Sequence, residues 1–115
     1  MVNHVAFESE YDALSEAVQD EMRAMAALLQ LYGPRLGRPW IDTLTSSRHA
    51  NMKELRFTAD GGVWRGAFAF DLERKAVLLV AGDKAGVAQR RFYWNLIAKA
   101  DKRLDEHLAA LEKEK

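Results

Sequence analysis

Hydrophobic positions recur with a helical period in the first third of the chain. This spacing predicts a helical region that ends at Gly33-Pro34, with apolar positions at Tyr11, Leu14, Val18, Met22, Met25, Leu29 and Tyr32. Ser9 is the candidate N-cap, with Asp12 three residues later, although Ser15 could instead divide the region into two shorter helices. Before this region, residues 3–7 alternate in the manner of a short edge strand.

The middle of the chain changes to the alternation of β-strands. Residues 33–51 contain both prolines and are expected to be mainly loop. Three strands are predicted over residues 52–58, 63–70 and 76–81, and the turn Asp60-Gly61-Gly62 joins the first two as a hairpin. The third strand is apolar on both faces, as a strand covered on both sides would be.

Helical spacing returns near the C-terminus. The apolar positions of this amphipathic helix are Phe92, Leu96, Ile97, Ala100, Leu104, Leu108 and Leu111. A strand, one or two helices, three meandering strands and a helix predict an α+β protein whose mainly antiparallel sheet packs against helices. With 115 residues, the chain has the length of one domain, so we expect residues 1–115 to form a single domain.

One arginine lies in the middle of the second predicted strand. In the stretch VWRGAFAFD, residues 63–71, alternation places the aromatic residues on the buried face and Arg65 on the other, with Ala67 and Ala69. These alanines are too small to fill the space beside a guanidinium. The pattern therefore predicts a hollow on the Arg65 face of the sheet.

The preceding strand carries a second arginine on the same face. Leu55 and Phe57 should face the core, which leaves Glu54 and Arg56 on the side of Arg65. An ion pair between Glu54 and Arg56 is the ordinary structural explanation for these two residues.

Further cations follow the third strand. The stretch VAGDKAGVAQRRFY contains a glycine-flanked loop, where backbone could approach a ligand, and then a helix start that offers free amide groups to an anion. We predict that several cations line one concave sheet face, namely Lys53, Arg56, Arg65 and Lys84. At its edge we expect His49, Arg90, Arg91 and Tyr93.

The distribution of charge is compatible with such a surface. The net charge is zero, but residues 1–34 carry one Lys or Arg against six Asp or Glu, and residues 84–103 carry six against one. Residues 35–66 carry six against three. One face should therefore suit polyanions, although solvated helix faces would give the same counts.

Several kinds of site and location are not expected. The chain has no cysteine and its three histidines are dispersed, so we expect no disulfide, no metal site and no cofactor. The N-terminus lacks the basic start and apolar stretch of a signal peptide, and residues 76–82 form an apolar run too short to span a membrane. A cytoplasmic protein is therefore expected.

Fixed cations, one phenol and one imidazole without a metal suit the cleavage of an RNA phosphodiester. The 2′-OH would attack the adjacent phosphate while the cations stabilise the charge that gathers on it. A Lys, His or Tyr with a suitable pKa could move the protons, and bases could stack on an exposed aromatic ring or an arginine.

The order of these stretches resembles the RelE/HigB-like toxins of bacterial type II toxin–antitoxin systems, in particular the phage-derived branch related to HigB. The likeness covers residues 32–110 and is carried by YGPRLGRPWIDTL, SRHANMKELRF, VWRGAFAFD, KAVLLVAGDKAG and the basic helix from Gln89. It implies the small RelE/ParE-like toxin fold and an mRNA interferase, that is, a ribosome-dependent endoribonuclease. It also implies a helix-turn-helix, HigA-like antitoxin as partner.

The resemblance also implies roles for individual residues. Arg65 corresponds to the strand arginine that contacts the scissile phosphate, and Arg56 closes the ELR motif. Lys84 stands where the family often places a cation, and Lys53 precedes ELR, where other members often carry an aromatic residue. Tyr93 corresponds to a catalytic tyrosine or histidine near the C-terminus of other members. These five are the expected catalytic residues; the expected RNA contacts are His49, Arg90 and Arg91.

Two other functions are compatible with the sequence. ParE-like toxins share the fold but inhibit DNA gyrase by binding it, without nuclease activity. The cations expected around Arg65 favour the nuclease, since a gyrase-binding protein would not need them in one hollow. A chain that binds its antitoxin but has lost toxicity is the second alternative.

Overall fold

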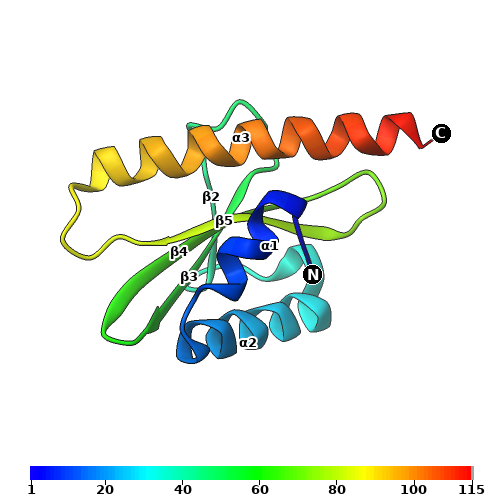
Figure 1. Ribbon diagram of the computed structural model, residues 1–115. Coiled ribbons are helices and arrows are strands. Elements are labelled where there is room, and N and C mark those ends of the chain that lie inside the picture. Colours follow the sequence, from blue (N-terminus) through cyan, green and yellow to red (C-terminus); the bar gives the residue numbers. More distant parts are fainter. Residues whose placement is uncertain (115) are drawn as a thin grey trace.

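A five-stranded sheet lies between two helical layers in the computed structural model, which describes residues 1–114 (Figure 1). The sheet has the order β1-β5-β4-β3-β2, with strands β1 Val2–Asn3, β2 Ile41–Thr43, β3 Lys53–Ala59, β4 Gly62–Phe70 and β5 Ala76–Asp83. Its faces are covered by α1 Val5–Asp12 and α2 Glu16–Tyr32 on one side and by α3 Gln89–Lys113 on the other, and the 3₁₀ turn η1 Gly33–Arg35 follows α2. The predicted α+β class is confirmed.

The central meander has the predicted form. Strands β3, β4 and β5 pair antiparallel, and the β3–β4 hairpin closes with the pair Ala59↔Gly62. Asp60 and Gly61 form its two-residue turn with φ of 50° and 71°. Positive φ at both central residues is the backbone of a type I′ turn, which matches the twist of the flanking strands. The predicted hairpin is therefore confirmed.

The two edge strands differ from the prediction. Strand β2 pairs antiparallel with β3, although the sequence predicted mainly loop over residues 33–51. Three residues are too few to show a period of two, which is why the pattern missed this strand. At the other edge, β1 pairs parallel with β5, but the predicted strand over residues 3–7 is wrong beyond Asn3, because residues 5–7 belong to helix α1.

The helical region near the N-terminus is divided into two helices. Helix α1 begins early because His4 Nδ1 accepts a hydrogen bond from the amide of Ala6 at 3.0 Å. The candidate N-cap at Ser9 is wrong, since this residue lies inside α1. Ser15 caps α2 by accepting from the amide of Val18 at 3.3 Å, so the two-helix alternative is the right one.

The aromatic face of the meander packs on α1 and α2, as predicted. The buried cluster on this face combines strand residues with helix residues, namely Leu55, Phe57, Phe68 and Leu78 with Phe7, Val18, Met22, Met25 and Leu29. Trp64 and Phe70 are partly buried against the same cluster. The predicted inward face of β3 and β4 is therefore confirmed.

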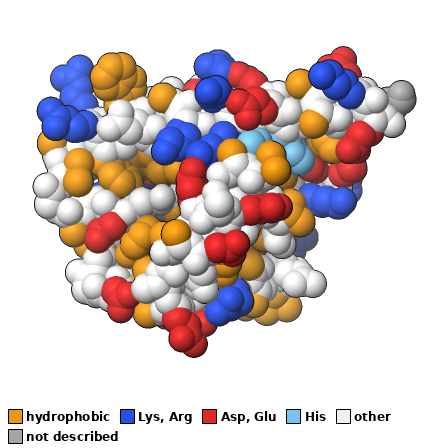
Figure 2. Space-filling model, in the orientation of Figure 1, with side chains coloured by type: hydrophobic (Ala, Val, Ile, Leu, Met, Phe, Trp, Pro, Cys, Tyr) orange, Lys and Arg blue, Asp and Glu red, His pale blue; other side chains and the backbone are white. Residues whose placement is uncertain are grey.

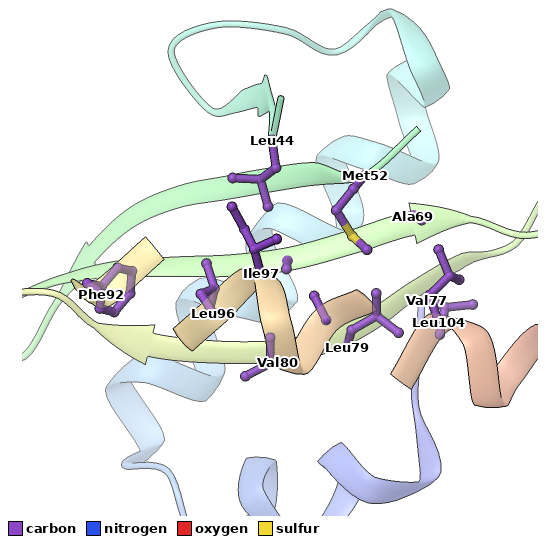
Figure 3. Close-up of a cluster of buried hydrophobic side chains, with 12 residues drawn as sticks. Leu44, Met52, Ala69, Val77, Leu79, Val80, Phe92, Leu96, Ile97 and Leu104 are labelled. Atoms are coloured by element: carbon purple, nitrogen blue, oxygen red, sulfur yellow. The ribbon is translucent and has the colours of Figure 1, made fainter. Parts of the chain in front are cut away.

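The opposite face of the sheet is also covered. Ala67 and Ala69 are 0% exposed and belong to a second cluster with residues of α3. Figure 3 shows the α3 side chains of Leu96, Ile97 and Leu104 against the strand residues of this cluster. The predicted hollow beside the alanines is wrong, because their small side chains let α3 pack closely on the sheet.

None of the helices in residues 1–114 could span a membrane. Within residues 1–114, every helix is too short or too polar to cross a lipid bilayer.

Candidate active site

Two arginines face each other across the β3–β4 ladder. Arg56 and Arg65 are register partners, so their side chains share one face of the sheet, the face that carries α3. Like charges directly opposite one another are unfavourable unless other groups compensate them. The groups around each arginine therefore decide what this position can do.

Arg56 is compensated by carboxylates. Its Nε donates to Oε1 of Glu54 at 2.8 Å, and its Nη2 lies 3.5 Å from Oδ2 of Asp42 on β2. The expected ion pair between Glu54 and Arg56 is confirmed. The side chain of Arg56 is still 37% exposed, so part of its guanidinium can be reached from solvent.

Arg65 has a different environment. Its Nε donates to the hydroxyl of Tyr93 at 3.2 Å, and its Nη1 donates to the carbonyl of Trp64 at 2.8 Å. Within residues 1–114, no carboxylate forms an ion pair with this half-buried guanidinium. A guanidinium has five N–H donors, so most of them stay available to an anionic ligand.

Tyr93 reaches Arg65 from the second turn of α3. Gly82 is the β5 partner of Arg65, and a Cβ there would lie 3.2 Å from the ring of Phe92. The missing side chain lets the start of α3 come close to the sheet, next to Arg65. This approach explains how a residue so far along the chain meets the β3–β4 hairpin.

The environment of Tyr93 keeps its phenol neutral. Burial raises the pKa of the Tyr93 hydroxyl above its usual value, and the neighbouring Glu54 carboxyl raises it further, whereas Arg65 opposes both. A neutral phenol at physiological pH can donate one proton and accept another.

Glu54 is the residue that sequence reasoning did not assign to the site. It is 3% exposed, and its Oε2 is a buried oxygen that receives no hydrogen bond from any group in residues 1–114. Strand alternation did place Glu54 beside Arg56 and Arg65, but the ion pair with Arg56 seemed a sufficient reason for its presence. Its deep burial is visible only in the fold. We call Glu54, Arg56, Arg65 and Tyr93 the arginine cluster.

Lys84 lies near this cluster. Its amide donates to the carbonyl of Val63 at 2.8 Å, which continues the β4–β5 pairing one step beyond β5. Lys84 follows Gly82, the partner of Arg65, by two residues, about 7 Å along the strand direction and on the same face.

Lys53 lies on the other face of the sheet. It directly precedes Glu54 on β3, so alternation directs it toward the α2 side, and its Nζ donates to Oγ1 of Thr43 at 3.0 Å. The prediction that Lys53 lines one face with Arg56 and Arg65 is therefore wrong. Two adjacent strand residues cannot share a face in regular pairing.

His49 is also separate from the arginine cluster. Its Nε2 lies 2.8 Å from Oδ1 of Asp105, which is paired with Arg48 as well. Asp105 follows Tyr93 by twelve residues on α3, which corresponds to about 18 Å along the helix. The predicted position of His49 at the edge of the cluster is wrong, because the loop that carries it is tied to the middle of α3.

Arg90 and Arg91 lie at the exposed start of α3. They line an open groove of about 1210 Å³ together with Ser46, Ala88, Gln89, Tyr93, Trp94, Asn95 and Ile97. We call this the α3 groove. Figure 2 shows basic side chains beside hydrophobic ones over this end of the molecule. Tyr93 belongs to both the groove and the arginine cluster, so the two adjoin at this residue.

Trp94 is a further residue that sequence reasoning missed. Its side chain is 76% exposed in the α3 groove, which is unusual for so large an aromatic residue. It lies four residues after Arg90, on the same side of α3. That spacing to a basic residue was the available signal in the sequence.

Metal ligands do not gather at this site. Among residues 1–114, no three or more His, Cys, Asp or Glu side chains come close enough together to hold a metal ion.

The family of the chain follows from comparison with known proteins. Residues 9–105 match the model of the family described as phage derived protein Gp49-like (DUF891). The chain belongs to the Gp49-like family. The predicted resemblance to the phage-derived, HigB-related branch of toxins is thus confirmed.

Two relatives of this Gp49-like protein come from Mycobacterium tuberculosis (strain ATCC 25618 / H37Rv). The protein named "Putative toxin HigB2" is 46% identical over 90 residues, 77% of this chain and 44% of that protein. The protein named "Putative toxin HigB3" is 43% identical over 98 residues, 85% of this chain and 83% of that protein. The chain therefore spans less than half the length of the first relative and most of the second. No solved structure matches the chain significantly.

Proposed function

We propose that this Gp49-like protein is the toxin of a type II toxin–antitoxin system and that it cleaves mRNA on the ribosome without a metal ion. The toxin names of its two relatives support the first part. One observation carries the second part: Arg65, which has no carboxylate partner in residues 1–114, lies opposite Arg56 and is bound to the hydroxyl of Tyr93.

The arginine cluster suits a phosphodiester in which charge gathers on the phosphate oxygens. Arg65 holds its guanidinium in place with two hydrogen bonds and keeps its other donors available. Arg56 and Lys84 add positive charge from the neighbouring strand and loop. Fixed cations of this kind stabilise the transition state because they need no reorganisation as the charge develops.

The α3 groove suits the RNA that flanks the scissile phosphate. Arg90 and Arg91 would neutralise backbone phosphates, and the exposed ring of Trp94 would stack on a base. Because Tyr93 is shared, a strand bound in the groove leads directly to Arg65. Lys53 and His49 have no part in this proposal, because one faces α2 and the other is bound to Asp105.

The proposed partner is a helix-turn-helix antitoxin of the HigA type, which would suppress the toxin by covering the arginine cluster or by keeping it off the ribosome. The ribosome and its mRNA are the other proposed partners, which would place the protein in the cytoplasm. Co-expression of the adjacent helix-turn-helix gene should give a complex and relieve growth arrest. A gene product that did neither would contradict this pairing.

The test of the function is cleavage of a message by translating ribosomes that receive the purified protein. New message ends with 2′,3′-cyclic phosphates are expected, since the 2′-OH is the nucleophile. Cleavage should persist when transition metals are chelated and only the magnesium required by ribosomes is supplied. Cleavage that returned specifically with zinc or manganese would contradict the mechanism. An uncut message together with inhibited gyrase supercoiling would favour the ParE-like alternative, and inactivity in both assays would favour the inactive one.

A further inference from the structure

The carboxyl group of Glu54 is buried with only half of its hydrogen-bonding capacity used. Its Oε1 accepts from Arg56 at 2.8 Å, whereas its Oε2 is buried and receives no hydrogen bond within residues 1–114. A buried carboxylate oxygen without a donor is costly, and native proteins rarely keep one without a use for it.

The group that faces this carboxyl from α3 is the hydroxyl of Tyr93. The phenol oxygen already accepts from Nε of Arg65 at 3.2 Å, so its own proton is available to a second acceptor. Glu54 is close enough to influence the ionisation of Tyr93, but the pair does not meet the geometry of a hydrogen bond. A hydrogen bond from the Tyr93 hydroxyl to Glu54 would give that proton an acceptor.

The other charged groups around Glu54 come from the remaining strands. Arg56 on β3 and Arg65 on β4 lie on the same face, and Asp42 on β2 contacts Arg56 from the edge. Glu54 therefore lies between Arg56, which it pairs with, and Arg65, which has no carboxylate partner in residues 1–114.

We propose that Glu54 is the proton acceptor of the cleavage reaction and that Tyr93 passes the proton to it. The proposal rests on the proposed function and assigns the base of that same site. Oε2 of Glu54 is too deeply buried to touch RNA, whereas Tyr93 lines the α3 groove and can touch it.

Two proton transfers accompany the attack of the 2′ oxygen on phosphorus. The substrate 2′-OH gives its proton to the oxygen of Tyr93 while the Tyr93 proton moves to Oε2 of Glu54. The 2′ oxygen forms a bond to phosphorus, and the bond between phosphorus and the 5′ oxygen breaks. A water molecule protonates the leaving 5′ oxygen, and Glu54 later returns its proton to solvent through Tyr93. The products are a 2′,3′-cyclic phosphate and a 5′-hydroxyl.

The test compares Glu54→Gln and Tyr93→Phe with wild type in single-turnover cleavage on ribosomes. Each variant keeps the shape of its side chain, and each should slow cleavage by about 10²–10⁴, the usual range for general acid–base catalysis. The double variant should be no slower than the slower single variant, because both changes interrupt one proton path. The matched control is Asp71→Asn, a buried carboxylate bound to His107, which should cleave at the wild-type rate once folded.

Two further measurements separate a proton acceptor from a residue that only holds its neighbours in place. Wild-type cleavage should slow as the pH falls, because a protonated Glu54 accepts nothing, and Glu54→Gln should lose this dependence. A substrate with sulfur in place of the 5′ oxygen has a leaving group that needs no proton, so it restores cleavage by variants that lack the general acid. Glu54 is proposed as the base, so this substrate should not restore cleavage by Glu54→Gln.

Each outcome decides for or against the proposal. Wild-type rates from folded Glu54→Gln, an unchanged pH dependence, or rescue by the 5′-sulfur substrate would overturn the role of Glu54 as base. Those results would leave the nuclease function intact, whereas a wild-type protein that cuts no message would refute the function itself. If Glu54→Gln does not fold, Tyr93→Phe tests the same path with the carboxylate and its Arg56 pair retained.

Discussion

The polar groups that pack against the two ends of helix α3 differ in how completely they are paired. Toward its C-terminus, Arg103 donates to Glu10 at 3.0 Å and to the carbonyl of Leu79 at 2.7 Å, and His107 lies 2.9 Å from Asp71. Near its N-terminus, Arg65 has no acidic partner within residues 1–114 and Glu54 keeps one carboxylate oxygen unused.

This difference identifies the region where unpaired buried polar groups lower the stability of the fold. Both ends press the same helix on the same sheet, so the fold could have satisfied the polar groups at either end. Satisfied buried networks hold a core in one arrangement, whereas unsatisfied ones are costly and occur at functional sites. We therefore interpret the C-terminal half of α3 as structural and its N-terminal half as the working end.

The sharpest test of this contrast is Arg65→Ala. Loss of a transition-state donor costs about 2.7–4 kcal/mol, so cleavage should slow by about 10²–10³ while the melting temperature changes little. Arg65→Lys should not restore full activity, because an ammonium cannot present the two-pronged guanidinium to a phosphate. Cleavage on ribosomes and thermal unfolding are measured together. A folded Arg65→Ala protein that cleaves like wild type would show that the polar groups near the N-terminal half of α3 do not form the active site.

The second test concerns the exposed ring at the working end. Trp94→Ala should weaken the reaction by about 1–3 kcal/mol at low ribosome concentration, the usual value for one stacked base. Trp94→Phe should retain most of the activity. Leu72→Ala is the control, since Leu72 is 75% exposed but lies in the β4–β5 turn. Normal cleavage by Trp94→Ala together with lost antitoxin binding would assign the ring to the protein partner.

Arg103→Met tests the structural end. Removing the guanidinium leaves the Leu79 carbonyl and Glu10 without their donor, so the free energy of unfolding should fall by about 1–3 kcal/mol in urea titrations. The folded fraction should cleave at the wild-type rate. A variant that kept its stability but lost activity would show that the two ends are coupled.

Acid should destabilise the contact between Asp71 and the C-terminal half of α3 by protonating Asp71. Burial raises the pKa of this carboxyl, but hydrogen bonds from His107 and from the amides of Lys75 and Glu73 outweigh it, so the pKa is lowered overall. A lowered pKa stabilises the fold above the unfolded value, about 3.9, and this stability is lost as the pH falls through the folded value. Between about pH 5 and 3, wild type should therefore lose stability more steeply than Asp71→Asn. Parallel curves from chemical denaturation would contradict the sign.

The smallest effects are expected from the pairs that Arg48 and His49 form with Asp105 on α3. Arg48→Ala removes an ion pair whose side chains are 60% and 46% exposed, and it should change the free energy of unfolding by about 0–1 kcal/mol. His49→Ala should likewise leave cleavage nearly unchanged, because His49 is bound to Asp105 and lies far from Tyr93. A large loss of cleavage in His49→Ala would extend the functional region to Asp105, in the C-terminal half of α3.

The sequence by itself determined the central meander, the C-terminal helix and the faces of β3 and β4. Alternation in β3 and β4 placed Arg56 and Arg65 together, opposite the aromatic core, and Asp60-Gly61 determined the hairpin. These features depend on neighbours two residues apart or on the φ values of single residues, which a local pattern records directly. The prediction placed Lys53 on the face of Arg56 and Arg65, although the same period of two assigns it to the opposite face.

Only the tertiary structure decided which residues meet between α3 and the sheet. The close packing on Ala67 and the side chain missing at Gly82 bring Tyr93 to Arg65, and the burial of Glu54 appears only in the folded chain. It also ties the loop of His49 to a distant turn of α3. Such contacts join segments that lie tens of residues apart, so they depend on how loops close and helices dock. No local period carries that information, and for this reason the base proposed for this site became visible only in the folded chain.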